Sequence, residues 1–127
     1  MIKMNKIIEL APSDIDTFLH YKELNLGIIR ITDDLYEGDA ESFLRELLFV
    51  RNSGKMSITI YLMSAGGAVY PVFAIYDALM DFRKNGGIVD CIVEGFAASA
   101  AAMLILQAAT IRKSRANARF LLHEVRK

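Results

Sequence analysis

The 127-residue chain has little of what would tie it to an oxidising compartment or to nucleic acid. It contains a single cysteine, Cys91, so no internal disulfide can form, which favours a reducing compartment. Fifteen Lys and Arg residues balance fifteen Asp and Glu residues, so no excess of positive charge is present to attract a phosphate backbone. We therefore expect no nucleic-acid partner.

The sequence also has no apolar run long enough for a membrane. The longest weakly polar stretch, Gly95 to Ile111, is rich in alanine and falls short of the roughly 20 residues that span a bilayer, so we expect a buried helix there. Residues Met1 to Lys6 do not resemble a secretory signal. Together with the single cysteine, this favours a cytoplasmic location.

Apolar residues are plentiful, and they follow a regular order. They make up 54% of the chain, an excess that would be buried between subunits in an oligomer. Residues 1–25 show no clear period and are expected to form an N-terminal arm or a weakly ordered helix, whereas residues 26–127 are expected to form one domain.

Short β-branched or apolar runs predict strands at 27–31, 57–63, 88–93 and 120–122.

Between these runs the sequence predicts helices. Two helices have apolar residues at intervals of three and four, the first ending at Asn52 to Lys55 and the second at Asn85 to Gly87; their predicted buried faces are Ala40, Phe43, Leu44, Leu47 and Leu48, and Val72, Phe73, Ile75, Tyr76, Leu79, Met80 and Phe82. Asp33 and Asp34 are placed to cap the first. With the alanine-rich helix, this order implies an α/β fold with a mostly parallel sheet.

Three chemically suggestive features follow predicted strands, at the edge where sites of parallel sheets collect. Ser99 opens the alanine-rich helix, Gly66–Gly67 follows the second strand, and His123 ends the fourth. A serine hydroxyl needs a base, and imidazole is the usual base near pH 7. The pattern predicts acyl transfer with Ser99 as nucleophile, His123 as base, and the N–H groups of Gly67 and Ala100 as oxyanion donors.

Each feature taken alone also has a purely structural interpretation. A serine that opens a helix is more often a cap than a nucleophile. A Gly-Gly pair after a strand is usually a turn, and a histidine near a strand end is more often a surface residue. His20, the other histidine, lies in the poorly patterned N-terminal segment and is the weaker candidate. The joint placement of all three features favours the catalytic interpretation.

These motifs resemble the proteolytic subunit of the Clp protease, the caseinolytic serine peptidase family. Tyr61–Gly67 is similar to the family's strand ending in Asn-Ser-Pro-Gly-Gly, Ala74–Asp77 to its Ile-Tyr-Asp helix, Gly95–Ala100 to Gly-Gln-Ala-Ala-Ser-Met, and Arg119–His123 to Arg-Val-Met-Ile-His. The resemblance runs from about Ile28 to His123. It implies a spiral of ββα units, an architecture shared with the crotonase superfamily, and the same roles for Ser99, His123, Gly67 and Ala100.

The resemblance also implies what the domain works on and with. Gly66, Ala68 and Val69 would lie along an extended polypeptide substrate, and hydrolysis would need no cofactor and no metal. The expected partners are unfolded polypeptides, further copies of the chain in a ring of the heptamer type, and an AAA+ unfoldase that delivers the substrate.

The sequence departs from the family at several positions. Ala65 stands where the family has proline, Ala100 where it usually has methionine, and the segment around Asn85–Gly87 is an addition. The family's triad aspartate lies well beyond the histidine, whereas this sequence ends at Lys127. Glu124 is a poor substitute because successive strand residues point to opposite faces.

We therefore expect a Clp-like domain that is incomplete at its C-terminus and, as this chain alone, weakly active or inactive. Two alternatives stay open. One is a non-catalytic or truncated subunit of such a ring. The other is an acyl-CoA enzyme of the crotonase superfamily, which would use carboxylates in place of a serine nucleophile, so the pairing of Ser99 with His123 argues against it.

Overall fold

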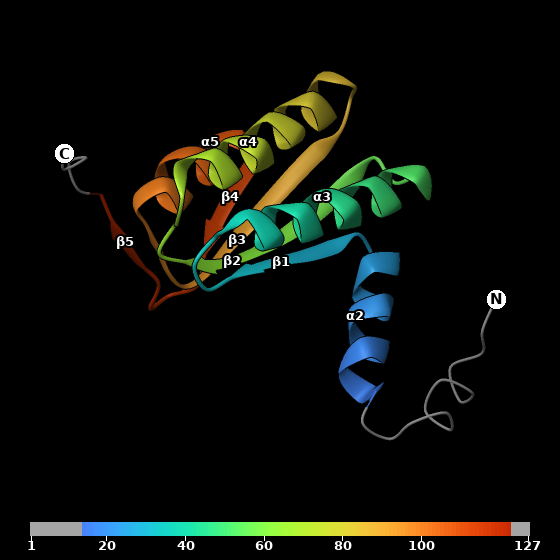
Figure 1. The fold of residues 1–127 in the computed structure, drawn as a ribbon, viewed down its shortest axis with the longest axis horizontal. Helices are drawn as coiled ribbons and strands as arrows, with labels where there is room; N and C mark the ends of the chain where they lie inside the picture. Colours follow the sequence, from blue (N-terminus) through green and yellow to red (C-terminus); the bar gives the residue numbers. More distant parts are fainter. Residues whose placement is uncertain (1–13, 123–127) are drawn as a thin grey trace.

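A parallel β-sheet forms the centre of the molecule in the computed structural model, which describes residues 14–122 (Figure 1). Its strands are β1 (Ile28–Thr32), β2 (Ser57–Ser64), β3 (Ile88–Ala98), β4 (Ile111–Ser114) and β5 (Arg119–Leu121). Strands β1 to β4 are neighbours in chain order, and β5 pairs with β3 beyond the end of β4. Every pairing is parallel, which confirms the predicted fold class.

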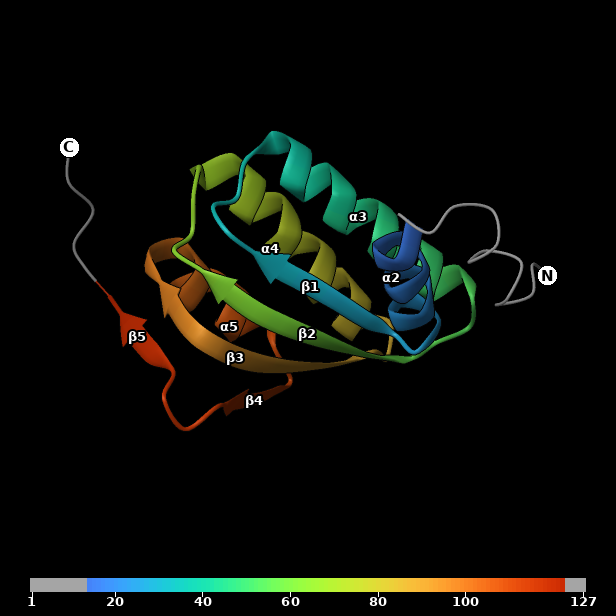
Figure 2. The same ribbon diagram turned by 90° about the horizontal axis from the view of Figure 1, so that it is seen from below.

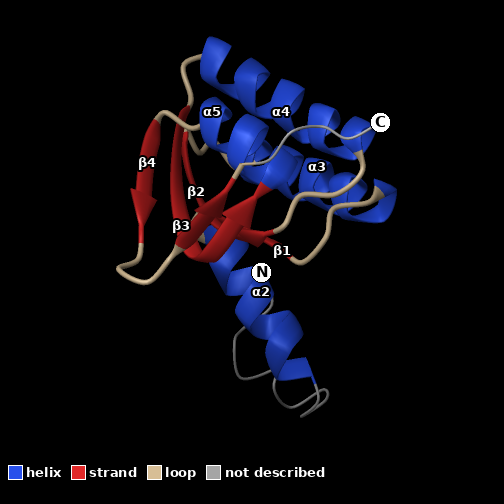
Figure 3. Cartoon of the chain, turned by 90° about the vertical axis from the view of Figure 1, so that its left-hand side faces the viewer, coloured by secondary structure: helices blue, strands red, loops and turns tan. Residues whose placement is uncertain are grey.

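Among the described residues, one helix precedes the first strand, and the others follow the strands and cover one face of the sheet. They are α2 (Ile15–Asn25), α3 (Glu37–Asn52), α4 (Val69–Lys84), the π-helix η2 (Ala101–Ile105) and the short α5 (Leu106–Ala108). Figures 2 and 3 show α3, α4 and α5 together on the same side of the strands. Within residues 14–122, no helix is both long enough and apolar enough to cross a membrane.

The core lies between this face of the sheet and the helices. Side chains alternate between the two faces of a strand, and every second residue of β2 is buried, namely Ile58, Ile60, Leu62 and Ser64. The opposite face carries ion pairs in place of a second helix layer: Lys113 binds Asp90 (2.9 Å), and Arg30 and Arg115 both approach Glu94 (3.8 and 3.5 Å). The sheet therefore has one apolar face packed against helices and one face that carries ion pairs.

Strand β3 bends in its middle, and the bend prepares the site. Leu62 of β2 pairs with Val93, but Ser64 pairs with Ala97, so β3 has extra residues at an irregularity in the register. Gly95 has a φ of 71°, and a Cβ at this position would lie 2.9 Å from Sδ of Met63. The first half of β3 pairs with β4 and the second half with β5. The bulge therefore changes the direction of the last residues of β3, which lead to Ser99.

Helix α2 is attached at the edge of the sheet, beside β1 and α3 (Figure 1). Only Phe18 is buried among its residues. Two polar contacts hold it: His20 Nε2 hydrogen-bonds Oε1 of Glu46 on α3, and Arg30 of β1 donates to both carboxylate oxygens of Glu23. The segment 1–25, expected to be an arm or a weakly ordered helix, thus contains a defined helix from Ile15 to Asn25, and its first 13 residues lie outside the described residues.

The structure corrects several predictions. Four apolar residues predicted to be buried are exposed, because the buried face of α3 and of α4 is narrower than the apolar face that the sequence predicts. These residues are Leu44, Leu48, Phe73 and Met80. Asp33 and Asp34 do not cap α3. Instead the N–H of Tyr36 donates to Oδ2 of Asp39 (2.9 Å), so the cap comes from inside the helix.

Two further corrections concern the segment after Val93. Gly95–Ala98, predicted as the start of the alanine-rich helix, continues β3, and the helix that follows is mainly a π-helix. Ile111–Ser114, for which the sequence predicts no strand, is strand β4. The predicted strand at 120–122 is present one residue earlier, as β5.

Candidate active site

Ser99 occupies a strained turn between β3 and η2. Its φ is 54°, in the left-handed region that residues with a Cβ rarely adopt, and the residue is half-buried. Such a conformation costs about 1–3 kcal/mol and persists only where the surroundings enforce it. A sharp strand-to-helix turn of this kind holds a serine hydroxyl out at the end of a sheet.

The geometry of Ser99 does not fit a helix cap. A capping serine has extended backbone, and its oxygen accepts a hydrogen bond from an N–H two or three residues further on. Ser99 has left-handed backbone, and the first turn of η2 has no side-chain cap. Among residues 14–122, the Ser99 hydroxyl forms no hydrogen bond that would commit it to a structural role.

The Gly66–Gly67 turn after β2 packs against the backbone next to Ser99. A Cβ on Gly66, whose φ is 96°, would lie 3.0 Å from the amide nitrogen of Ala100 and 3.2 Å from the carbonyl oxygen of Ala98. A Cβ on Gly67 would lie 2.1 Å from the carbonyl oxygen of Leu35. Both positions need glycine because backbone from another segment occupies the space of a side chain.

A short parallel bridge to Leu35 fixes the direction of the Gly67 amide. The N–H of Leu35 donates to the carbonyl of Gly66 (2.7 Å), and the N–H of Ala68 donates to the carbonyl of Leu35 (3.0 Å). Gly67 is the central residue of this bridge, between Gly66 and Ala68, and in a parallel bridge the N–H of the central residue points away from the partner strand. Gly67 is exposed, and within the part of the chain that the structure describes its N–H has no protein acceptor.

Ala100 supplies a second N–H at the same place. It directly follows Ser99 at the start of the helical segment, where N–H groups have no acceptor within the helix. Ala68 is half-buried and Val69 is exposed at the first turn of α4, so both border the glycine turn. The structure thus brings together Ser99, Ala100, Gly66 and Gly67, with Ala68 and Val69 beside them.

The predicted base, His123, lies outside the described residues, as does Glu124. The structure does show the strand that leads to it: Leu121 of β5 pairs with Ala98, the residue before Ser99. His20 is placed elsewhere, on α2, where it bonds Glu46. The last described part of the chain therefore runs directly toward the Ser99 turn.

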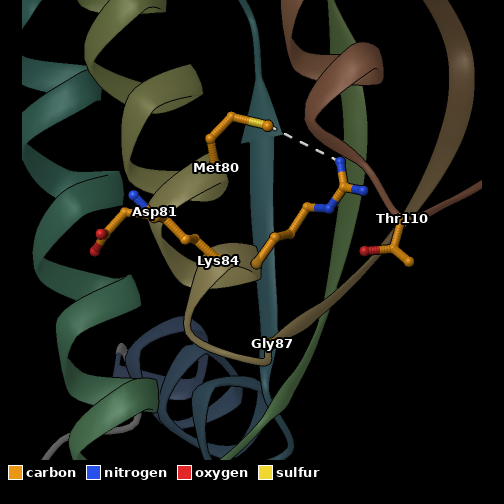
Figure 4. Close-up of a pocket in the computed structure, with 6 residues that line it drawn as sticks. Met80, Asp81, Lys84, Gly87 and Thr110 are labelled. Atoms are coloured by element: carbon orange, nitrogen blue, oxygen red, sulfur yellow. Dashed lines mark hydrogen bonds between the residues drawn. The ribbon is translucent and has the colours of Figure 1, made fainter.

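A cavity of about 660 Å³ opens at the opposite end of the sheet (Figure 4). It is lined by the C-terminal turns of α4 and the residues before β3 and β4, namely Met80, Asp81, Arg83, Lys84, Gly87 and Thr110. Arg83 reaches across it to Sδ of Met80 (3.9 Å) and the carbonyl of Ala108 (3.3 Å). Because Ser99 lies at the carboxyl end of β3, this cavity is separate from the candidate site.

Comparison with known proteins points to one family. The family model described as Clp protease matches residues 15–127, a range that includes Ser99, His123 and the glycine turn. None of the curated proteins matches the chain. The family match favours a Clp-type peptidase over the crotonase alternative.

Proposed function

The chain belongs to the Clp protease family, and on that premise we propose that it is a serine endopeptidase subunit that hydrolyses unfolded polypeptides. The observation that carries the proposal is the left-handed turn at Ser99, with a φ of 54°, packed against the Gly66–Gly67 turn. A strained serine next to the N–H of Ala100 and the glycine turn is an arrangement suited to acyl transfer.

In the proposed reaction, Oγ of Ser99 attacks the carbonyl carbon of a peptide bond while the imidazole of His123 takes the hydroxyl proton. The N–H groups of Gly67 and Ala100 donate to the oxygen that becomes negative in the tetrahedral intermediate. The imidazolium then gives its proton to the leaving amine, and the acyl group stays on Ser99. Water, deprotonated by the same imidazole, hydrolyses this ester. No cofactor or metal enters the reaction.

The register of β5 supports the role of His123. Residues 119–121 pair in order with residues 96–98. Strand β5 therefore ends beside the residue that precedes Ser99, and His123 follows two residues later in the sequence.

The substrate would lie across the exposed border of the site. Gly66, Ala68 and Val69 would follow its backbone; of these, Val69 is exposed and Ala68 is half-buried. Exposed apolar side chains of Phe96 and Phe120 lie on the strands that lead to Ser99. Unfolded polypeptides expose apolar side chains of the kind that such a border can contact.

Clp proteases in general form oligomeric rings that work with AAA+ partners. We propose the same organisation for this chain: a ring of the heptamer type that receives polypeptides from an AAA+ unfoldase in the cytoplasm. The single cysteine, which is buried, is consistent with a reducing compartment.

Labelling with a fluorophosphonate probe tests the proposal. The wild-type protein is expected to be labelled at Ser99, Ser99→Ala to be unlabelled, and His123→Ala to be labelled at least about 10²-fold more slowly because the general base is lost. His20→Ala is the matched control, since it removes the other histidine, and its labelling rate is expected to stay at the wild-type value. A folded, oligomeric protein without any labelling would overturn the peptidase proposal and leave a non-catalytic ring subunit.

A further inference from the structure

Ser64 is the one buried polar side chain among residues 14–122. It ends β2 on the face that otherwise carries Ile58, Ile60 and Leu62, and its exposed fraction is 0%. A hydroxyl in such a place is unfavourable unless its hydrogen-bonding groups are satisfied. Its presence in the apolar layer therefore calls for a structural reason.

The hydroxyl of Ser64 connects two separate loops. It donates to the carbonyl of Asp33 (2.6 Å), in the loop after β1, and accepts the N–H of Gly66 (3.0 Å), in the glycine turn. Asp33 has a φ of 62°, so the loop is itself tightly bent where it meets the hydroxyl. Ser64 thus fixes the glycine turn to the end of the neighbouring strand.

This attachment acts on the peptide group that contains the candidate oxyanion donor. The carbonyl of Gly66 and the N–H of Gly67 belong to one planar trans peptide, so they point in opposite directions. The carbonyl is held by the N–H of Leu35 (2.7 Å), which directs the Gly67 N–H outward. The hydroxyl of Ser64 holds the same residue, Gly66, from its N–H side.

We infer that Ser64 is a positioning residue for the Gly67 oxyanion donor, an inference that rests on the proposed peptidase function. The hydroxyl does not touch substrate. It holds Gly66 so that the peptide between Gly66 and Gly67 cannot rotate, and thereby keeps the donor aimed at the space in front of Ser99. Loss of the hydroxyl leaves a buried Gly66 N–H without acceptor, and the turn shifts to satisfy it.

The test compares Ser64→Ala with Thr110→Val. The control removes a hydroxyl that also accepts a backbone N–H, that of Val89 (3.0 Å), at the opposite end of the sheet. For fluorophosphonate labelling of the full chain, the maximal rate is measured separately from the half-saturating probe concentration. Ser64→Ala is expected to lower the maximal rate about 10–10²-fold, as a displacement of about 1 Å can, with the half-saturating concentration unchanged. Thr110→Val is expected to stay within about twofold.

Equal maximal rates for Ser64→Ala and wild type, or equal losses in both variants, would overturn the inference. If Ser64→Ala does not fold, Ser64→Cys replaces it, because a thiol is a weaker donor and acceptor of similar shape. Amide hydrogen exchange supplies a readout that needs no catalysis. The Gly66 amide, which Ser64 holds in the wild type, is expected to exchange at least about tenfold faster in the Ser64 variant and not in Thr110→Val.

The two proposals fail in different ways. Absence of labelling in the wild type overturns the peptidase proposal, and the exchange measurement still decides whether Ser64 holds the turn. Unchanged exchange at Gly66 in the Ser64 variant overturns the positioning role, whatever the labelling of the wild type.

Discussion

At the scale of single residues, the left-handed backbone of Ser99 is expected to lower the stability of the fold. A left-handed conformation costs a residue with a Cβ about 1–2 kcal/mol relative to glycine. Since Ser99→Ala and Ser99→Gly both remove the hydroxyl, their difference isolates this strain. We expect the free energy of unfolding of Ser99→Gly to exceed that of Ser99→Ala by about 1 kcal/mol in urea titrations. Equal stabilities would show that Ser99 is not strained in the folded protein.

Cys91 presents the opposite case, a reactive group that the fold conceals. It lies in the middle of β3 with an exposed fraction of 0%, and burial, aided by the charge of Asp90, raises the pKa of its thiol to about 12. Because the thiolate is the reactive species, the folded protein at pH 8 is expected to react with a disulfide reagent at least about 10²-fold more slowly than the chain in guanidinium chloride. Comparable rates in both conditions would contradict the buried placement.

Several residues of the site could be predicted from the sequence, and the reason differs for each. Ser99 and Gly67 stand directly after apolar runs, which is a local pattern. Ser64 was not identified from the sequence. The signal was present, because Ser64 continues the alternation of buried residues in β2 and is a polar residue at a position where that alternation predicts an apolar one. The bridge between Leu35 and Gly67 could not be predicted, because the two residues lie in loops that are distant in sequence.

At the scale of elements, the start of α3 depends on a carboxylate inside the helix. Oδ2 of Asp39 accepts the N–H of Tyr36, an otherwise unpaired donor of the first turn. Asp39→Ala is expected to lower the free energy of unfolding by about 0.5–2 kcal/mol. Glu41→Ala on the same helix is the matched control; it removes only an exposed pair with Arg45 and is expected to cost less than about 0.5 kcal/mol in the same denaturation experiment. Equal losses in the two variants would contradict the cap.

The attachment of α2 is expected to weaken in acid. The hydrogen bonds from Arg30 lower the pKa of the Glu23 carboxyl below its ordinary value of about 4.3. A lowered pKa in the folded state means that the ionised carboxylate stabilises the fold above pH about 4.3, and that this contribution is lost as the pH falls through the lowered value. The difference in thermal midpoint between wild type and Glu23→Gln is therefore expected to be full at pH 6 and to shrink toward pH 3.

A constant difference in midpoint over this range would show that the ion pair does not hold α2. Hydrogen exchange of the α2 amides at the same pH values gives the local readout, because these amides report the opening of that helix alone. The Leu47 region of α3, buried in the core, serves as the internal reference.

The elements that the sequence mispredicted share one cause. Strand β4 is exposed along its whole length, so it carries no apolar alternation, and only its pairing with β3 makes it a strand. Leu44 and Leu48 continue an apolar helix face beyond the width that the sheet covers. The bend at Gly95 arises where Met63 packs against it. In each case a contact with a residue distant in sequence determines the local structure. The long helices α3 and α4, by contrast, could be placed from the spacing of their apolar residues alone.

At the scale of the whole molecule, uncovered apolar surface is consistent with the proposed ring. Leu48 and Phe49 of α3 are 56% and 41% exposed, and Phe73 of α4 is 44% exposed. Light scattering is expected to give a mass several times the 14.2 kDa of one chain. The mass is expected to fall in high dilution, as association requires. A stable monomer at micromolar concentration would contradict the ring.

The double pairing of β3 also has a consequence for the order in which the protein matures during synthesis. The Ser99 turn is bordered by the glycine turn, which forms once β1 and β2 have paired, and by β5, the last strand that the structure describes. Parallel pairings between distant segments form late in folding. Under the proposed peptidase function, a chain still emerging from the ribosome would thus carry Ser99 without its surroundings, and we expect it to be inactive toward neighbouring nascent chains until β5 has joined β3.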